Sequence, residues 1–266
     1  MPGLRLASAL TLIPLVVIVL GPLAGLFAKA ATLSGPAFVD AALSPRALAS
    51  LRLSFTAALA AAAANAVFGL LLAWVLVRYR FRGRELVDAA VDLPFALPTA
   101  VAGLTLTALY SEHGVLGAPL ARVGVKVAYA PLGIAVALTF VGLPFVVRAV
   151  QPVLAGLDAH VEEAAATLGA SRAQVFMRIT LPALTPSLLA GFTMAFARGA
   201  GEYGSVVFIS GNMPMKTEIA PLLIVTKLEQ YDYAGATALA VVMLTFSFAL
   251  LFVVNALQRW SARWAA

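Results

Sequence analysis

The residues best placed to do chemistry carry charge within an otherwise apolar stretch. Arg198 and Glu202 lie four positions apart, so on a helix they share one face and can form an ion pair. A charged side chain inside a bilayer costs on the order of 2.5–3.5 kcal/mol, so both should face the protein interior or a water-filled path. Neighbouring glycines would allow a local break that exposes backbone N–H groups, which suit an anion. The pattern predicts a gate or pathway element built from Arg198, Gly201, Glu202 and Tyr203, with a structural ion pair between helices as the alternative.

No other set of side chains supports a reaction. The chain has no cysteine, which excludes disulfides, thiolate metal sites and cysteine nucleophiles. Its two histidines, His113 and His160, are far apart in the sequence, and no nucleophile is paired with a base. A Gly-rich phosphate loop of the P-loop type is also missing from the sequence. We therefore expect no cofactor, no metal and no enzymatic activity, and any ATP would be bound by a separate chain.

The composition is that of a membrane protein. Of the 266 residues, 62% are hydrophobic and 11% are charged, whereas a soluble domain carries roughly 25% charged residues. The net charge of +6 lies in short clusters between apolar runs. That placement suits the anionic headgroups of a lipid bilayer and not a nucleic acid.

Six stretches meet the requirement of about 20 mainly apolar residues for a membrane-spanning helix. We predict an all-α integral membrane protein with six spans, a single domain over residues 1–266 and a five-helix core over about 51–258. The first stretch could be a cleaved signal peptide, but its apolar run is longer than a typical h-region, which favours a retained helix. The predicted spans are Leu6–Ala28, Ser54–Val77, Val91–Tyr110, Val127–Val147, Ser187–Ile209 and Ala236–Leu257.

Positive charges predict the orientation, because Lys and Arg accumulate in cytoplasmic loops. Arg5 precedes the first span, and Arg259 and Arg263 follow the sixth. With an even number of spans, these ends and the loops after the second and fourth spans share one side. Both termini are therefore predicted to be cytoplasmic. The arginines of the two loops are Arg78, Arg80, Arg82, Arg84, Arg148, Arg172 and Arg178.

The loop between the fourth and fifth spans, residues 151–186, is too polar at its centre to cross a membrane. Two glutamates and three alanines precede Gly169, Ser171 is a good N-cap, and apolar residues follow until Pro182. We predict two short helices that are broken near Gly169 and lie at the cytoplasmic surface, with Pro182 ending the second. A rigid surface of this kind could receive force from a soluble partner, whereas an ordinary interfacial amphipathic helix is the alternative.

This loop resembles the EAA signature of ABC importer permeases. The residue types and the spacing match at every fixed position: Glu-Ala-Ala at 163–165, then Gly169, then Ile179, and finally Leu-Pro at 181–182. The resemblance implies a type I importer permease fold, in which the loop forms cytoplasmic coupling helices that dock on an ATPase subunit. The residues to which it gives the coupling role are Glu163, Ala164, Ala165, Gly169, Ile179, Leu181 and Pro182.

Four further runs narrow the resemblance to permeases for tetrahedral oxyanions. The run from Arg198 to Gly204 is similar to the fifth-span signature of sulfate and molybdate permeases. The runs 93–103, 218–225 and 227–237 are similar to the T-type subunit of the sulfate/thiosulfate importer in the binding-protein-dependent inner-membrane component family. Gly199 departs from the pattern, since a larger residue is more usual there, but this departure leaves the class of the resemblance intact.

The resemblance implies a bacterial inner-membrane assembly of several subunits. Its parts would be this chain, a homologous W-type permease subunit, two ATPase subunits and a periplasmic sulfate-binding protein. Molybdate or tungstate is the alternative cargo, and a self-sufficient secondary transporter is the alternative class. Such a transporter needs titratable groups within the membrane, and Arg198 and Glu202 are the clear candidates.

Overall fold

The computed structural model describes the backbone of residues 10–262 and the side chains of residues 10–256. Arg5, Arg263 and the first residues of the first predicted span lie outside these ranges, as does the side chain of Arg259. The regular elements of the described chain are all helical, which confirms the all-α prediction. Five of its helices are long and apolar enough to cross a membrane: Leu10–Ala31, Pro45–Arg78, Pro131–Ala155, Arg172–Ala200 and Tyr233–Ala256.

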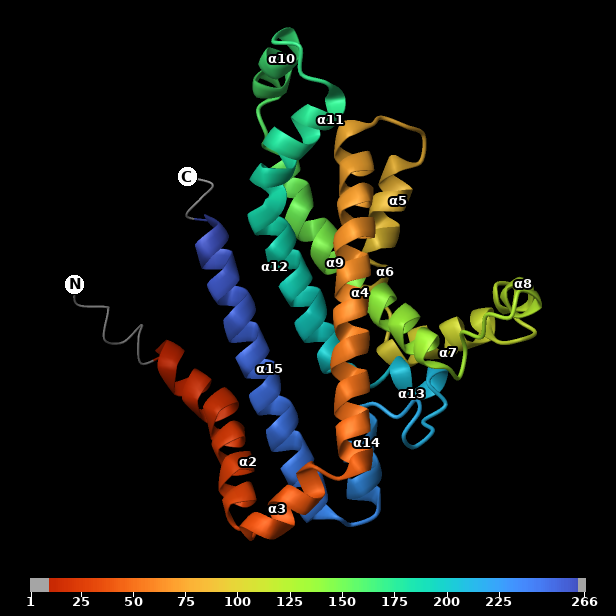
Figure 1. Cartoon of the computed structure of the whole chain (residues 1–266), viewed down its shortest axis with the longest axis vertical. Helices are drawn as coiled ribbons and strands as arrows, with labels where there is room; N and C mark the ends of the chain where they lie inside the picture. The colour runs from red at the N-terminus through yellow and green to blue at the C-terminus, as the bar shows by residue number, and fades with distance from the viewer. Residues whose placement is uncertain (1–9, 263–266) are drawn as a thin grey trace, which may run out of the picture.

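Three helices form the core of the bundle: α4 (Pro45–Arg78), α9 (Pro131–Ala155) and α12 (Leu181–Ala200) run side by side (Figure 1). Glycines let their backbones approach closely around Val146 of α9. A Cβ atom added at Gly69 of α4 would lie 2.8 Å from Val146 Cγ1, and one added at Gly191 of α12 would lie 2.7 Å from Val146 Cα. Val146 is therefore held between two glycines, one from each neighbouring helix.

The remaining long helices cover the side of this core. The N-terminal helix, composed of η1 (Leu15–Leu20) and α2 (Gly21–Ala31), is followed by α3 (Gly35–Ala42), and both pack against α15 (Tyr233–Ala262) (Figure 1). Their outer faces carry large apolar side chains, which suits contact with lipid. On α15 these exposed side chains are Phe246, Phe248, Phe252 and Val253.

The structure differs from the sequence expectation at the third span. Residues 84–110 form three short helices, α5 (Arg84–Val91), α6 (Leu93–Ala96) and α7 (Thr99–Tyr110), none of them long enough to cross a membrane. Pro98 disfavours the helical conformation of Leu97, which is extended with ψ 135° and separates α6 from α7. After this break, α7 and the following α8 (Gly117–Arg122) lead sideways away from the bundle (Figure 1).

A second difference concerns the fifth span, which begins earlier than expected. Helix α11 (Arg172–Val175), the π-helical turn η2 (Phe176–Thr180) and α12 join into one continuous helix of 29 residues. The expectation that Pro182 ends a short helix is therefore wrong. Pro182 lies in the first turn of α12, directly after the wide π turn, so its missing N–H interrupts no regular α-helical ladder.

The bundle has two ends that differ in their connections. The turn after α4 and the helix α10 (Ala159–Thr167) lie at one end, here called the α10 end (Figure 1). The helices α3 and α14 (Ala220–Glu229) lie at the other, here called the α14 end. The short helix α13 (Val206–Ile209) packs against α7 on that side of the core.

Candidate functional site

The predicted coupling residues lie in one continuous feature at the α10 end. Glu163, Ala164 and Ala165 are on α10, and Gly169 lies in the turn that follows it. Gly169 has a φ of +88°, a left-handed conformation that disfavours any residue with a Cβ, which confirms the predicted break. The next helix begins with a capping box in which the Ser171 side chain accepts from the Gln174 N–H. The remaining three residues, Ile179, Leu181 and Pro182, lie where this helix enters the core.

The outer surface of this loop is open to solvent. The side chain of Glu163 is 72% exposed, and its carboxylate lies 3.5 Å from Nδ1 of His160, which is even more exposed. Leu168, beside the Gly169 turn, is 89% exposed. An exposed acid next to an exposed leucine and a bare backbone turn offers another protein both a charge and an apolar contact.

Glu162 points the other way, and sequence reasoning missed its role. Its carboxylate accepts from Arg78 Nη2 at 2.6 Å and from Thr180 Oγ1 at 3.1 Å. The Arg78 guanidinium also lies 5.4 Å from the ring centre of Trp74, whose indole packs edge-on against Phe176. The loop is thus joined to the end of α4. Successive helical residues point about 100° apart, which could have signalled that Glu162 and Glu163 face different surroundings.

The predicted gate residues lie together near the α14 end of α12. Arg198 Nη1 and Glu202 Oε2 form the expected ion pair. The Glu202 side chain is 1% exposed and that of Arg198 is 36% exposed. The other carboxylate oxygen, Oε1, accepts from the backbone N–H and the hydroxyl of Ser205 at 2.8 and 3.0 Å. Glu202 is therefore fixed in place, while Arg198 keeps donors that can reach solvent.

The local break that the glycines predicted is present. Helix α12 ends at Ala200 with Gly201 as its C-cap, and the half-exposed Tyr203 follows in the turn. Gly204 allows this turn to touch α7, because a Cβ atom there would lie 2.1 Å from Thr99 Oγ1. At the level of this turn, Gly199 faces Ala58 of α4. Twenty helical residues separate Ala58 from Arg78, a distance of about 30 Å, which matches the thickness of the hydrocarbon core.

A second charged cluster joins α5 to α9, and sequence reasoning did not identify it. Arg148 forms a two-pronged ion pair with Asp92, at 2.9 and 2.6 Å, and contacts Asp88 at 2.7 Å. Hydrogen bonds from Gln151 and from Arg148 lower the pKa of Asp88. The cluster connects the turn after α4 to the core.

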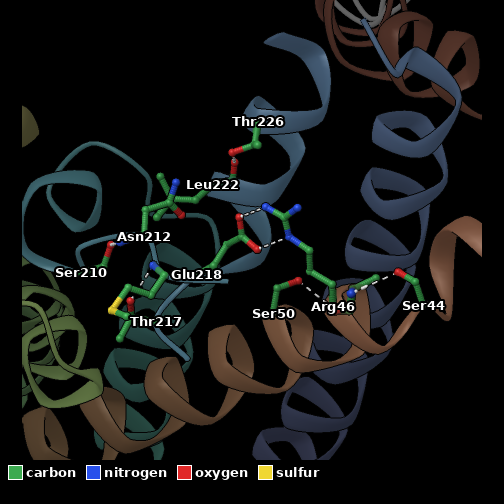
Figure 2. Close-up of polar contacts among 11 residues, drawn as sticks. Ser44, Arg46, Ser50, Ser210, Asn212, Thr217, Glu218, Leu222 and Thr226 are labelled. Carbon is green, nitrogen blue, oxygen red and sulfur yellow. Dashed lines mark hydrogen bonds and ion pairs between the residues drawn. The ribbon is translucent and has the colours of Figure 1, made fainter. Parts of the chain in front are cut away.

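The α14 end is held by an ion pair between Arg46 and Glu218, of which the glutamate is buried and the arginine is partly exposed (Figure 2). Arg46 at the start of α4 donates to both carboxylate oxygens of Glu218, at 2.7 and 2.6 Å, and the Glu218 side chain is almost fully buried. Ser54 of α4 accepts a hydrogen bond from the backbone of Ala220 at 2.7 Å. Just beyond α14, a hydrogen bond from Lys227, followed by one from the Gly235 N–H, lowers the pKa of Asp232. Helix α14 is therefore attached rigidly to α4.

Comparison with known proteins gives the family. The model of the binding-protein-dependent transport system inner membrane component matches residues 65–266. The chain belongs to this family. The match covers most of the chain and includes both α10 and the Arg198–Glu202 pair. It confirms the expected type of protein, which is a transport subunit with several membrane-spanning helices in an inner membrane.

Curated relatives are similar over nearly the whole length. The sulfate transport system permease protein CysT of Salmonella typhimurium is 48% identical over 258 residues, which is 97% of this chain and 93% of the relative. The protein of the same name from Synechococcus elongatus is 50% identical over 254 residues, covering 96% and 91% of the two chains.

Solved structures confirm the fold. A bacterial ABC transporter that imports the acidic polysaccharide alginate superposes with a TM-score of 0.78 at 17% identity, over 97% of this chain and 96% of the other. An amino acid ABC transporter gives a TM-score of 0.57 at 16% identity, over 86% and 99%. This family member therefore has the expected type I importer permease fold.

Proposed function

We propose that this chain is the T-type permease subunit of an ABC importer for sulfate or thiosulfate, in which it forms half of a path that opens alternately to the two sides. The names of its relatives, which are about half identical to it, support sulfate as the cargo. The observation that carries the mechanism is the continuous helix Arg172–Ala200. It begins beside the Gly169 turn and ends beside the Arg198–Glu202 pair, so one rigid element joins the coupling loop to the gate.

The coupling loop is the docking site for the ATPase dimer. Gly169 leaves the backbone of the turn bare, Leu168 projects beside it, and Glu163 supplies a charge. The alanines Ala164 and Ala165 keep α10 thin enough to enter a cleft in another protein. ATP binding and hydrolysis belong to the partner, and this chain converts the partner's closure into a displacement of its own helices.

The free face of α12 lines the path and meets a homologous W-type subunit. Met194 is the one large hydrophobic side chain of α12 that is exposed, whereas α15 exposes three phenylalanines. Small residues on a free helix face favour contact with another helix or with water over contact with lipid. Arg198 at the edge of this face, with donors open to solvent, would meet the anion, and Gly201, Glu202 and Tyr203 shape the turn around it.

The orientation follows from the same assignment. The α10 end, with the arginine-rich turn after α4, is cytoplasmic in a bacterial inner membrane. The segment from α5 to α7 leads the chain from that end back toward the α14 end, so it completes a sixth crossing together with the five long helices, and both termini lie on the cytoplasmic side. The α14 end faces the periplasm and receives the anion from a sulfate-binding protein. The rigid attachment of α14 to α4 through Arg46 and Glu218 gives such a partner a fixed surface to dock on.

Replacement of Gly169 tests the coupling role. In the complete transporter, reconstituted in liposomes with ATP, we expect Gly169→Leu to reduce sulfate uptake at least about tenfold, because the side chain strains the turn and blocks docking. Gly83→Leu is the matched control, since Gly83 has a φ of +87° and equally open surroundings at the same end of the bundle. Normal uptake by Gly169→Leu, with the variant inserted in the membrane, contradicts the coupling role.

Liposomes that contain this chain alone test the alternative class. An ion gradient should drive no sulfate flux into them, because uptake is powered by ATP hydrolysis on the ATPase subunits, which are absent from these liposomes. Robust flux would establish a secondary transporter. Replacement of sulfate by molybdate or tungstate in the complete system then separates the possible oxyanions.

A further inference from the structure

We propose that Glu162 and Arg78 are positioning residues that join the coupling loop to α4, so that a movement of the loop displaces α4 and α12 together. This rests on the coupling role proposed above. Neither residue belongs to the loop signature, because Glu162 precedes Glu163 and Arg78 lies 84 positions earlier in the chain.

The geometry gives the two neighbouring glutamates separate tasks. Glu163 is directed to solvent, where a docking protein can reach it, and Glu162 is directed to the bundle. The Glu162 oxygen Oε1 accepts from both Arg78 and Thr180, so a single atom joins α10, the end of α4 and the start of α12. A force on α10 therefore reaches α4 through this carboxylate, and it reaches α12 both through the carboxylate and through the backbone of the Gly169 turn.

The space around this link is open on the side of α10, although Trp74 of α4 packs against Phe176 of the next helix. A cavity of about 500 Å³ lies between the end of α4 and the loop, and its walls include Trp74, Ala166, Val175 and both members of the ion pair. Across a cavity, side chains lose the close contacts by which packed surfaces move as one body. The Glu162–Arg78 pair spans this space, so the tie between α10 and α4 is made by hydrogen bonds.

Arg78 is itself held in position. Its guanidinium lies over Trp74, which packs against Phe176 in the π-helical turn. Arg78 Nε is buried and has no hydrogen-bond partner. The guanidinium thus depends on Glu162 and on the tryptophan face for its orientation. Both partners of the pair are partly buried, with roughly a quarter of each side chain exposed, which limits competition from water.

A link that transmits movement differs experimentally from one that only stabilises. Loss of a stabilising contact lowers the melting temperature and reduces uptake and ATP hydrolysis in proportion. Loss of a transmitting contact leaves the ATPase subunits active while uptake fails. The informative quantity is therefore the number of sulfate ions imported per ATP hydrolysed.

The experiment uses the complete transporter in liposomes. We expect Glu162→Gln and Arg78→Gln each to lower the ratio of sulfate imported to ATP hydrolysed by about five- to tenfold, the usual size of a coupling between sites. Thr180→Val, which removes only the hydroxyl donor to Glu162, should lower it less. The exchanged pair, Arg78→Glu with Glu162→Arg, should restore part of the ratio, because it re-forms the ion pair but places a carboxylate against the Trp74 ring. Glu112→Gln, which breaks the exposed ion pair with Lys126, is the matched control and should leave the ratio unchanged.

The outcomes separate this inference from the proposed function. Retention of the wild-type ratio in both Glu162→Gln and Arg78→Gln overturns the link. If Gly169→Leu abolishes uptake in the same assay, the coupling role stands even though the link is rejected. If the wild-type complex imports no sulfate at all, the proposed function itself fails.

Discussion

At the scale of single residues, the most constrained group is the carboxylate of Glu202. It is almost fully buried, and three hydrogen-bond or ion-pair donors from Arg198 and Ser205 satisfy it. Because Ser205 holds one oxygen and Arg198 the other, the carboxylate fixes the guanidinium without covering it. The same pair therefore braces the turn after α12 and presents a positive charge toward solvent.

Neutralising this carboxylate should weaken the protein. Glu202→Gln keeps the shape of the side chain but loses the ion pair with Arg198. Its amide N–H₂ would also face the donors of Arg198 or Ser205. We therefore expect the free energy of unfolding to fall by about 1–3 kcal/mol. Thermal unfolding in detergent measures the change. Glu229→Gln is the control, since Glu229 is exposed and has no ion pair in the described structure. Equal melting temperatures for the two variants would contradict the assigned role.

Some residue contacts could be predicted from the sequence and others could not. The Arg198–Glu202 pair could be predicted because residues four positions apart on a helix face each other, and the contact forms although α12 ends at Ala200, just before Glu202. The pairs Arg78–Glu162 and Arg148–Asp88 join residues 84 and 60 positions apart, so they exist only after α4, α5 and α9 have packed. Charge in a loop predicts its side of the membrane, but it carries no information about which distant acid it will meet.

At the scale of elements, apolar length predicted most helices, and proline had opposite effects in two of the predicted spans. The helices α4, α9 and α15 follow their apolar runs. The prolines of the third predicted span divide it, because the residue before Pro98 turns extended. Pro182 does not divide the fifth, because a π-helical turn accommodates it. The difference depends on the turn before each proline, which composition does not reveal.

The contact of α12 with α9 gives a prediction at this scale. A leucine at Gly191 would meet the backbone of Val146, so we expect Gly191→Leu to force the helices apart and lower the free energy of unfolding by about 1–3 kcal/mol. Gly25→Leu on α2 is the control, because nothing lies within 4 Å of a Cβ atom there. Chemical denaturation of both variants in detergent tests the difference. An unchanged Gly191→Leu protein would contradict the close approach of the three core helices.

At the scale of the whole molecule, the orientation of the bundle gives a prediction. Leu168 at the α10 end and Tyr231 beside α14 are both strongly exposed, and the natural chain has no cysteine to interfere with labelling. In cells that express this chain without the ATPase, Tyr231→Cys should react with an impermeant maleimide added outside. Leu168→Cys should react only in inverted membrane vesicles or after permeabilisation. The opposite pattern would place the coupling loop outside the cell and reject the proposed function.

The wedge of Val146 between Gly69 and Gly191 has a mechanical consequence for α12. If the continuous helix tilts as one body about this contact, it acts as a lever whose pivot lies closer to its C-terminal end than to its N-terminal end. The arm from Gly191 to Arg172 is about 28 Å long, and the arm from Gly191 to Ala200 is about 14 Å, at 1.5 Å per residue. A stroke applied at the long arm would reverse direction, halve its amplitude and double its force where the anion crosses.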